Sequence, residues 1–345
     1  MPNLRYHISL AALTTALIVL AVLCLLIGSV DISAGAVWDI ICGRGAENKA
    51  WEIIVLQSRV PTIITAALAG AALAVSGLLL QTTFNNPLAG PSILGVSSGA
   101  GLGVAVVMLA FGGVIGSNSM GVSIGSYVAT LLGAVAGAGA VLGVLMAMAT
   151  IVKSNTMLLI VGILISYLTS SIVSLLNSIA SEEGVHSYVA WGFGSFSGVS
   201  VEQMPIFATL TILGLAASAL MVKPLNALLL GTRYAQNLGV DTKRARNRLL
   251  LITGVLTAVV TAFCGPIGFL GLVVPHIARL ALSTSNHIRL IPATILAGAD
   301  TALLCSLLSV SGNHGIIPIN AITPVIGIPI ILYIIINRRR INYFN

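Results

Sequence analysis

Charged side chains are scarce in this sequence: Asp, Glu, Lys and Arg make up 7% of the residues, whereas 57% are hydrophobic. A soluble globular domain carries about 25% charged residues, so that class is excluded. Uncharged apolar runs such as Leu10 to Ile27 dominate, and they are too long and too uniform for the alternating strands of a transmembrane β-barrel. The sequence therefore predicts an all-α membrane protein, with one domain over residues 1–345.

Cysteine is also scarce, with four residues in the sequence. Cys24, Cys42, Cys264 and Cys305 are scattered, and no C-x-x-C pair occurs. This spacing suggests neither a disulfide framework nor a zinc site, so we interpret the four cysteines as packing residues and expect no metal site and no cofactor.

The sequence also lacks G-x-x-x-x-G-K-[ST], the loop that cradles ATP phosphates. We therefore expect that the chain is not an enzyme. If it drives uphill transport, the energy must enter through another protein.

Crossing a hydrocarbon core of ~30 Å takes ~20 apolar helical residues. The first run resembles a signal peptide in its flanks, but its apolar part exceeds the usual ~7–15 residues, which favours a retained helix. The seventh and eighth runs meet around Gly265-Pro266. About ten transmembrane helices are predicted: 8–28, 60–82, 93–113, 124–150, 157–178, 203–222, 249–265, 266–282, 291–310 and 318–336.

Charge asymmetry predicts the orientation, because Lys and Arg collect in cytoplasmic loops. With the N-terminus inside, both termini are cytoplasmic and the net charge of +7 needs no nucleic acid to explain it. The inside segments then hold 13 of the 16 basic residues: Arg5, Lys153, Lys223, Arg233, Lys243, Arg244, Arg246, Arg248, Arg279, Arg289, Arg338, Arg339 and Arg340. The outside segments hold seven of the nine acids: Asp31, Asp39, Glu47, Glu52, Glu182, Glu183 and Glu202.

Small residues recur at four-residue spacing, which lets helix backbones approach closely in lipid. Packing within the chain is the favoured interpretation, and a dedicated dimer seam is the alternative. The pairs are Gly70 and Ala74, Gly99 and Gly103, Gly133 and Gly137, and Gly139 and Gly143.

Ionisable residues inside a membrane span are functional candidates by default. Asp300, near the middle of the ninth predicted helix, is the obvious one. A coupling carboxylate and a hydrogen-bonded structural acid are both open interpretations. We interpret His276 as a hydrogen-bonding residue at a helix end, because no second ligand stands at metal spacing beside it.

Two longer polar segments remain, an outside loop over about 29–59 and an inside loop over about 223–248. In the inside loop, Thr232 to Leu238 is predicted to form a short helix between Gly231 and Gly239, with Ala235 and Leu238 on one side. Insertion into a partner's groove and a connector on the membrane surface both fit this pattern.

The stretch NNPLAGPSILGVSSGAG, residues 85–101, interrupts two apolar runs. Pro87 disfavours helix at Asn86, and Ser92 is a candidate N-cap for the next helix. This predicts a tight cytoplasmic turn.

Several ordered motifs resemble the FecCD family, the permease subunits of bacterial iron-complex and cobalamin ABC importers. The resemblance covers about residues 50–335. Its motifs are RVPTIITAALAGAALAVSGLLLQ (59–81), NPLAGPSILGVSSGA (86–100), LLIVGI (158–163), WGFGSF (191–196), LNALLLGTRYAQNLGV (225–240) and GPIGFLGLVVPHIARL (265–280).

The resemblance implies a type II ABC importer permease of the bacterial inner membrane, working as a homodimer in lipid. Two cytoplasmic ATPase subunits and a substrate-binding protein are the implied partners. In the stretch matching the family's coupling helices, Gly231, Ala235, Leu238 and Gly239 match, while Thr232 stands where an acid is common.

The resemblance also implies an inner gate made by Asn86, Leu88, Asn155 and Thr156, although simple helix capping is an alternative for the last two. Arg59 matches an arginine that receives the binding protein. Other positions depart from the family pattern, including Thr62, Ser306 and Val310, so outer docking is open to other contacts such as Arg44 or Lys49.

The predicted function is import of a bulky metal chelate, meaning a ferric siderophore, haem or cobalamin, with the substrate itself undetermined by the sequence. Two other classes remain open. One is an ion-coupled secondary transporter that uses Asp300, and the other is a structural subunit of a larger membrane complex.

Overall fold

The structure, a computed structural model, describes residues 2–45, 48–110, 122–152, 154–310 and 317–336. Lys153, Glu47 and Arg338 to Arg340, which belong to the charge pattern above, lie outside these residues. Every regular element in the described ranges is a helix, which confirms the all-α prediction. The α-helices are α1 (Pro2–Leu26), α2 (Ala34–Ile41), α3 (Lys49–Ile53), α4 (Val60–Phe84), α5 (Val96–Ala105), α7 (Val122–Ile151), α8 (Asn155–Ile179), α9 (Glu182–Gly192), α10 (Met204–Leu220), α11 (Val222–Leu229), α12 (Thr232–Asn237), α13 (Thr242–Cys264), α14 (Leu270–Leu282), α15 (His287–Ser309) and α16 (Ile319–Ile336). Three short elements adjoin them: the π-helices η1 (Ile54–Arg59) and η3 (Val106–Ala110) and the 3-10 helix η2 (Pro91–Leu94).

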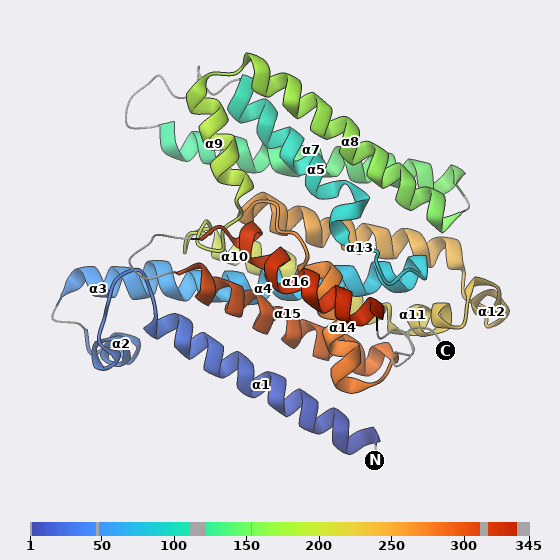
Figure 1. The fold of residues 1–345 in the computed structure, drawn as a ribbon, viewed down its shortest axis with the longest axis horizontal. Coiled ribbons are helices and arrows are strands. Elements are labelled where there is room, and N and C mark those ends of the chain that lie inside the picture. Colours follow the sequence, from blue (N-terminus) through green and yellow to red (C-terminus); the bar gives the residue numbers. More distant parts are fainter. Residues whose placement is uncertain (1, 46–47, 111–121, 153, 311–316, 337–345) are drawn as a thin grey trace.

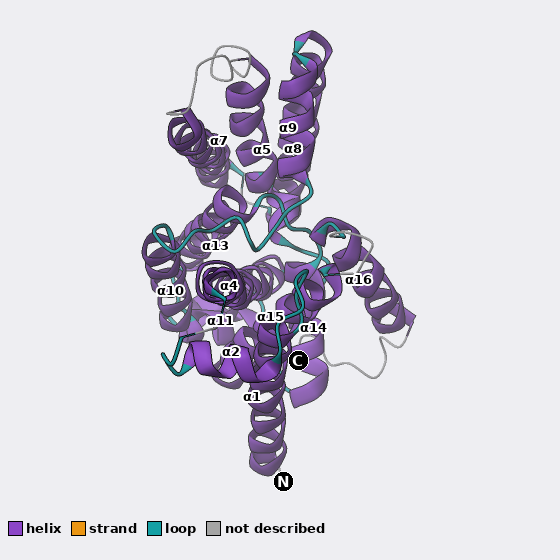
Figure 2. Cartoon of the chain, turned by 90° about the vertical axis from the view of Figure 1, so that its left-hand side faces the viewer, coloured by secondary structure: helices purple, strands orange, loops and turns teal. Residues whose placement is uncertain are grey.

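The long helices run side by side along one axis of the molecule (Figure 1). One group consists of α5, α7, α8 and α9, and the other surrounds α4. Seen end-on in Figure 2, α4 lies inside a ring of neighbours, and it packs against α10, α13, α14 and α15. Because α4 is enclosed on all sides, most of its second half is buried.

Small residues bring the helices of both groups together. A Cβ atom on Gly70 of α4 would overlap the carbonyl of Gly298 on α15, and one on Gly103 of α5 would overlap the carbonyl of Gly133 on α7. Packing within the chain is thus confirmed for these small-residue pairs. Gly139 and Gly143 differ, because a Cβ there would meet no described atom within 4 Å.

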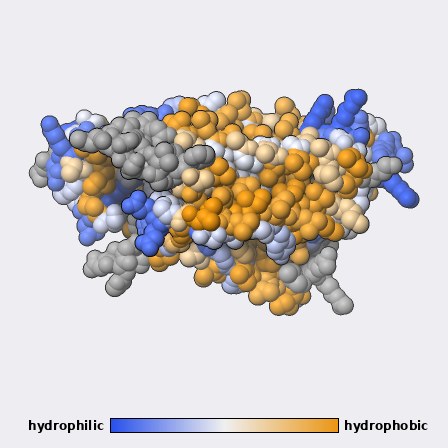
Figure 3. Space-filling model, turned by 90° about the horizontal axis from the view of Figure 1, so that it is seen from above, coloured by the Kyte–Doolittle hydropathy of each residue, from blue (hydrophilic) through white to orange (hydrophobic). Residues whose placement is uncertain are grey.

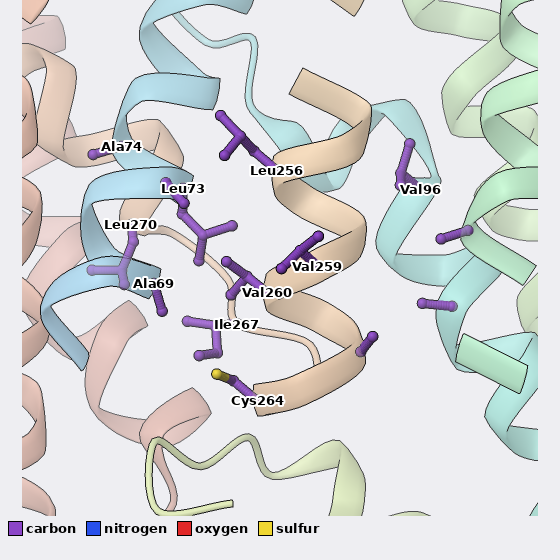
Figure 4. Close-up of a cluster of buried hydrophobic side chains, with 14 of the residues drawn as sticks. Ala69, Leu73, Ala74, Val96, Leu256, Val259, Val260, Cys264, Ile267 and Leu270 are labelled. Atoms are coloured by element: carbon purple, nitrogen blue, oxygen red, sulfur yellow. The ribbon is translucent and has the colours of Figure 1, made fainter. Parts of the chain in front are cut away.

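The apolar core between α4 and α13 is shown in Figure 4. Ala69 and Leu73 of α4 lie opposite Leu256 and Val260 of α13, and Ile267 closes the cluster from the segment that follows α13. These side chains are almost fully excluded from solvent. Close packing of small and branched residues therefore holds the centre of the bundle.

The surface has the pattern of a membrane protein. Figure 3 shows a hydrophobic middle band between two hydrophilic ends. Among the described residues, six helices are long and apolar enough to cross a membrane, and α10 with α11, which bend by 51°, form a seventh candidate. Three shorter apolar helices, Val96–Ala110, Leu270–Leu282 and Ile319–Tyr333, account for the other predicted spans. The predicted number of ten therefore depends on how the bent pair and the short helices are counted.

The two polar segments define the two ends of the bundle. The segment over 29–59 contains α2, α3 and η1, and the segment over 223–248 contains α11, α12 and the start of α13, so neither is a simple loop. The start of α1 and the last described turn of α16 lie at the same end as α12, opposite α2 and α3 (Figure 1). Which end faces the cytoplasm stays a prediction from charge.

The predicted junction at Gly265-Pro266 is wrong in one respect: the next helix begins at Leu270, four residues after the predicted start at residue 266. With 13 residues, α14 is about 20 Å long at 1.5 Å per residue, short of a full crossing. The segment between α13 and α14 is irregular, and the side chain of Asn320 on α16 pairs with its backbone groups. This side chain accepts from the Gly268 N–H over 3.1 Å and donates to the Pro266 carbonyl. Irregular backbone inside a membrane protein needs such internal partners.

Candidate functional site

The stretch that follows α4 forms a turn, which we name the gate turn (residues 85–90). Asn85 ends α4 in the left-handed conformation, with φ 49°, and the Asn86 side chain accepts from the Leu88 N–H over 2.9 Å. Leu88 itself is 45% exposed. The predicted tight turn is therefore confirmed, and its asparagine stabilises it from within.

The helix after the gate turn begins differently from the prediction. Ser92 lies within the 3-10 helix Pro91–Leu94 and is not the N-cap, which is Gly95 at φ 77°. A Cβ on Gly95 would stand 2.9 Å from the Gly162 carbonyl of α8, so the close approach of α8 excludes a larger residue there. A 3-10 turn over Pro91–Leu94 therefore precedes α5, which begins beside α8.

Asn155 and Thr156 lie at the start of α8, next to the end of α4. The N-cap of α8 is Ser154, which accepts from the Met157 N–H over 3.4 Å, so Asn155 has a different role from capping. Its amide donates to the Thr83 carbonyl over 2.9 Å, and its oxygen accepts from Arg246 of α13 over 3.5 Å. Thr156 is exposed beside it. The structure thus brings Asn155 to the gate turn.

A second set of polar contacts holds the other side of the gate turn. His276 of α14 has its Nε2 2.8 Å from the Pro87 carbonyl and donates to it, which confirms the predicted hydrogen bonding. Its predicted place at a helix end is wrong, because it lies in the middle of α14. Gln81 of α4 donates to the Leu272 carbonyl over 3.1 Å and accepts from Arg279 over 2.5 Å. All three side chains are buried. The gate turn is therefore held directly by α14, while α8 binds the last turn of α4 just before it.

The predicted docking helix, α12, spans Thr232–Asn237 between Gly231 and Gly239, which have φ 95° and 82°. Its predicted faces are wrong, because Ala235 is buried whereas Leu238 is 58% exposed. Tyr234 is equally exposed, at 57%. In Figure 1, α12 lies at one extremity of the molecule.

Arg59, the predicted docking residue for a binding protein, lies at the opposite end and is only 7% exposed. Its guanidinium donates to the carbonyls of Leu25, Leu26 and Val30, with distances of 2.5 to 3.0 Å. The carbonyls of Leu25 and Leu26 lie at the end of α1, where helical partners are missing, and the Val30 carbonyl lies in the segment that follows. Docking by Arg59 stays a prediction, and this geometry shows the residue bound within its own chain.

Asp300 lies in α15 and is 9% exposed. Neither carboxylate oxygen has a hydrogen-bond partner among the described residues. Among the residues that the structure describes, no three His, Cys, Asp or Glu side chains lie close enough together to hold a metal ion.

A pocket of about 560 Å³ lies between α5, α8, α9 and the start of α16. Hydroxyl groups dominate one wall, including those of Ser97, Ser98, Thr169 and Ser170, and the stacked rings of Tyr188 and Trp191 form another. None of the described residues that line it is charged. Such a lining offers weak, evenly spread polar contacts.

The sequence missed the contacts that Gln81, Arg246 and Arg279 make beside the gate turn. Gln81 and Arg279 carried a detectable signal as polar residues within largely apolar helices, whereas Arg246 lies in the basic start of α13. Their partners lie 91 to 198 residues away along the chain, which no local pattern reveals.

Comparison with known proteins agrees with this architecture. The model of the FecCD transport family matches residues 16–337. The vitamin B12 import system permease protein BtuC of Citrobacter koseri is 32% identical over 326 residues, covering 93% of this chain and 94% of that protein. BtuC of Escherichia coli O9:H4 is 32% identical over 331 residues, covering 94% and 95%.

A solved structure, an inward-facing conformation of a transporter assigned to the metal-chelate ABC type, superposes with a TM-score of 0.81. Its sequence is 31% identical, and the match covers 96% of this chain and 98% of that one. Taken with the apolar band of the fold, these matches identify a multi-pass protein of the bacterial inner membrane. The chain belongs to the FecCD transport family.

Proposed function

We propose that this chain is the membrane-spanning permease of an ATP-binding-cassette importer for a bulky metal chelate. The chain works as a homodimer, with two ATPase subunits at the α12 end and a substrate-binding protein at the α2 and α3 end. Hydrolysis of ATP takes place in the ATPase subunits. The named relatives, which import vitamin B12, and the metal-chelate transporter of similar fold support this proposal.

The observation that carries the proposal is the set of exposed apolar side chains in the α12 segment (residues 230–238). Tyr234 of α12 and the C-cap residues of α11 and α12, Leu230 and Leu238, are 52 to 58% exposed. In Figure 1, α12 lies at the end of the molecule that also holds the basic start of α13. Exposed apolar side chains on a short projecting helix suit the groove of a partner, which here is the ATPase.

The translocation path follows the pocket between α8 and α16. Its hydroxyl and aromatic lining lets a large complex pass without tight binding. A second copy of the chain encloses the path by packing against the exposed apolar face of α8, which includes Leu164, Leu168 and Leu175. The gate turn with Asn86 and Leu88, together with Asn155 and Thr156, closes the inner mouth.

Transport follows from alternation between two arrangements of this bundle. The binding protein delivers the chelate to the outer end, and ATP binding draws the ATPase subunits together. The α12 segment moves with them, and the helices around the path tilt. Ferric siderophore, haem and cobalamin all remain in the proposed substrate class, and the choice rests with the binding protein.

Reconstitution tests this function. The chain is placed in liposomes with and without its ATPase and binding-protein partners, and uptake of cyanocobalamin and of a ferric hydroxamate siderophore is measured. ATP-dependent uptake of either probe that requires the ATPase supports the proposal. Uptake by the chain alone overturns it in favour of a secondary transporter, a rival that gains no support from the relatives.

A substitution just after α12 tests whether the chain is instead a structural subunit of a larger membrane complex. Gly239 has φ 82°, which proline cannot adopt because its ring holds φ near −65°. Gly239→Pro is expected to fold in the membrane, yet to lose co-purification with the ATPase and stimulation of its activity. Unchanged stimulation contradicts a coupling role for α12.

A further inference from the structure

A chain of hydrogen bonds through the buried His287 connects α11, the helix that precedes α12, to the end of α4. His287, the first residue of α15, is fully buried, and its Nε2 lies 2.9 Å from the Thr82 hydroxyl. Its Nδ1 lies 2.9 Å from the side-chain oxygen of Asn226 on α11. Three elements far apart in the sequence therefore meet at one imidazole ring.

The direction of each bond follows from the donors present. The Asn226 oxygen also accepts from the His287 main-chain N–H over 2.9 Å, and its amide donates to Asn286 over 3.0 Å. Because this oxygen is an acceptor, Nδ1 of His287 carries the ring proton, and Nε2 accepts from the Thr82 hydroxyl. Both ring nitrogens of His287 therefore have a hydrogen-bond partner.

Helix capping does not account for this chain of bonds. Asn286 already caps α15, since its side chain accepts from the Ile288 N–H over 3.0 Å. Nor does a buried hydroxyl on α4 require a partner on another helix. The hydroxyls of Thr65 and Ser76 are buried in α4 without a hydrogen-bond partner among the described residues, and Thr83 bonds within its own helix.

The two ends of the chain of bonds adjoin the two functional regions. α11 ends at Leu229, and α12 begins at Thr232. At the other end, Thr82 lies in the last turn of α4, which Phe84 closes before the gate turn. Because α11 contacts α12, a displacement of α12 is expected to reach α11, and a polar route from α11 to the end of α4 runs through His287.

We propose that Asn226, His287 and Thr82 form a transmission relay, in which movement of α12 reaches the gate turn through the His287 ring. The three residues are positioning residues and touch neither ATP nor substrate. This inference rests on the proposed function, because it assumes that an ATPase moves α12. It predicts that breaking the relay separates ATP hydrolysis from gate movement.

The readout is the reactivity of a cysteine in the gate turn. Leu88→Cys is introduced together with Cys42→Ser, because Cys42 is the exposed cysteine and Cys24, Cys264 and Cys305 are buried. The protein is reconstituted with its ATPase, and labelling by a water-soluble maleimide is followed with and without ATP. Hydrolysis of ATP is measured on the same samples.

Thr82→Val removes the hydroxyl and keeps the shape. It is expected to retain ATP hydrolysis while the ATP-dependent change in labelling falls about tenfold, a factor that corresponds to ~1.4 kcal/mol. A loss of this size is typical when a buried acceptor is left unpaired. Thr82→Ser, which keeps the hydroxyl, is expected to restore the change.

Thr65→Val is the matched control, because it makes the same substitution in the same helix at a buried hydroxyl outside the relay. It is expected to leave the labelling change intact, whereas Asn226→Ala, at a half-buried position, is expected to behave like Thr82→Val. If Thr82→Val and Asn226→Ala both match the control, the relay is overturned and the proposed function stands. If ATP changes labelling in none of the proteins, including the Leu88→Cys background, the proposed function fails and the relay fails with it.

Discussion

The side-chain amide of Asn155 on α8 donates to the main-chain carbonyl of Thr83 on α4 over 2.9 Å. Thr83 lies one residue before the last residue of α4, so this bond joins the start of α8 to the edge of the gate turn. On the opposite side, His276 of α14 holds the Pro87 carbonyl. The end of α4 is thus fixed by α8, and the gate turn that follows it is fixed by α14; both helices contact α4.

Replacing Asn155 is expected to loosen the gate turn. Asn155→Leu keeps the volume but removes both the donor to Thr83 and the acceptor for Arg246, which costs about 1 kcal/mol per hydrogen bond. Without ATP, a cysteine at Leu88 is expected to react faster with maleimide than in the parent protein. Asn177→Leu, at the other end of α8, is the control and is expected to leave this rate unchanged. Equal rates in both variants contradict a gating role for Asn155.

The exposed apolar side chains of the α12 segment are expected to dominate ATPase binding. Tyr234→Ala or Leu238→Ala removes an apolar anchor, and anchors of this kind contribute about 2 kcal/mol, or roughly thirtyfold in Kd. Binding of the purified ATPase to the detergent-solubilised chain measures the effect. Leu132→Ala, equally exposed on α7 in the apolar band, is expected to bind the ATPase normally. Normal binding by the α12 variants would remove the main support for the proposed function.

Two glycine substitutions are expected to have opposite effects on stability. A Cβ on Gly77 of α4 would overlap the Gly271 carbonyl of α14, so Gly77→Ala is expected to destabilise the fold by about 1–3 kcal/mol. Gly139 faces open space, and Gly139→Ala is expected to be neutral or stabilising by up to ~1 kcal/mol, because alanine favours helix. Thermal unfolding, followed by a dye that reacts with the three buried cysteines as they become exposed, reports both changes.

Replacing Arg59 is expected to lower the stability of the fold. Arg59→Met removes three hydrogen bonds from a charged donor to carbonyls at the end of α1 and in the segment after it, which is expected to cost at least ~2 kcal/mol. Arg44→Met removes only an exposed contact with Asp39 and is expected to change stability by less than ~1 kcal/mol. Unfolding curves of the two variants check this difference. A stable Arg59→Met protein with weakened affinity for the binding protein would instead support the docking role.

Asp300 is expected to be dispensable for ATP-driven uptake. Asp300→Asn keeps the size of the side chain and removes the capacity for negative charge, so a carrier coupled through this carboxylate would stop. Uptake of cyanocobalamin or a ferric hydroxamate by the reconstituted complex is expected to remain within about twofold, a difference of ~0.4 kcal/mol. Complete loss of uptake with ATP hydrolysis intact would reopen a coupling role for Asp300.

The α12 segment illustrates what a local pattern can and cannot predict. Two glycines and a short polar stretch predicted a helix at Thr232, which the structure confirms. The same pattern placed Ala235 and Leu238 on one side, but Ala235 packs inward and Leu238 faces solvent. A helix of six residues has no periodicity long enough to define a face, so its neighbours α11 and α13 decide which side is buried.

The gate turn shows the same division. Pro87 and the asparagines predicted the turn, because their backbone preferences act within a few residues. The start of α5 at Gly95 was not predicted, since it depends on the approach of the Gly162 carbonyl from α8. Contacts with a distant helix override a local capping signal.

The sequence by itself determined the class of the protein, its apolar spans and its family motifs, and its charges predict an orientation, because hydropathy and charge act residue by residue. The tertiary structure alone decided which polar groups meet at the C-terminal end of α4. Gln81, Thr82 and Thr83 are consecutive, yet their partners lie on α14, α15 and α8. Only helix packing, guided by small residues that admit close approach, brings those partners within hydrogen-bonding distance.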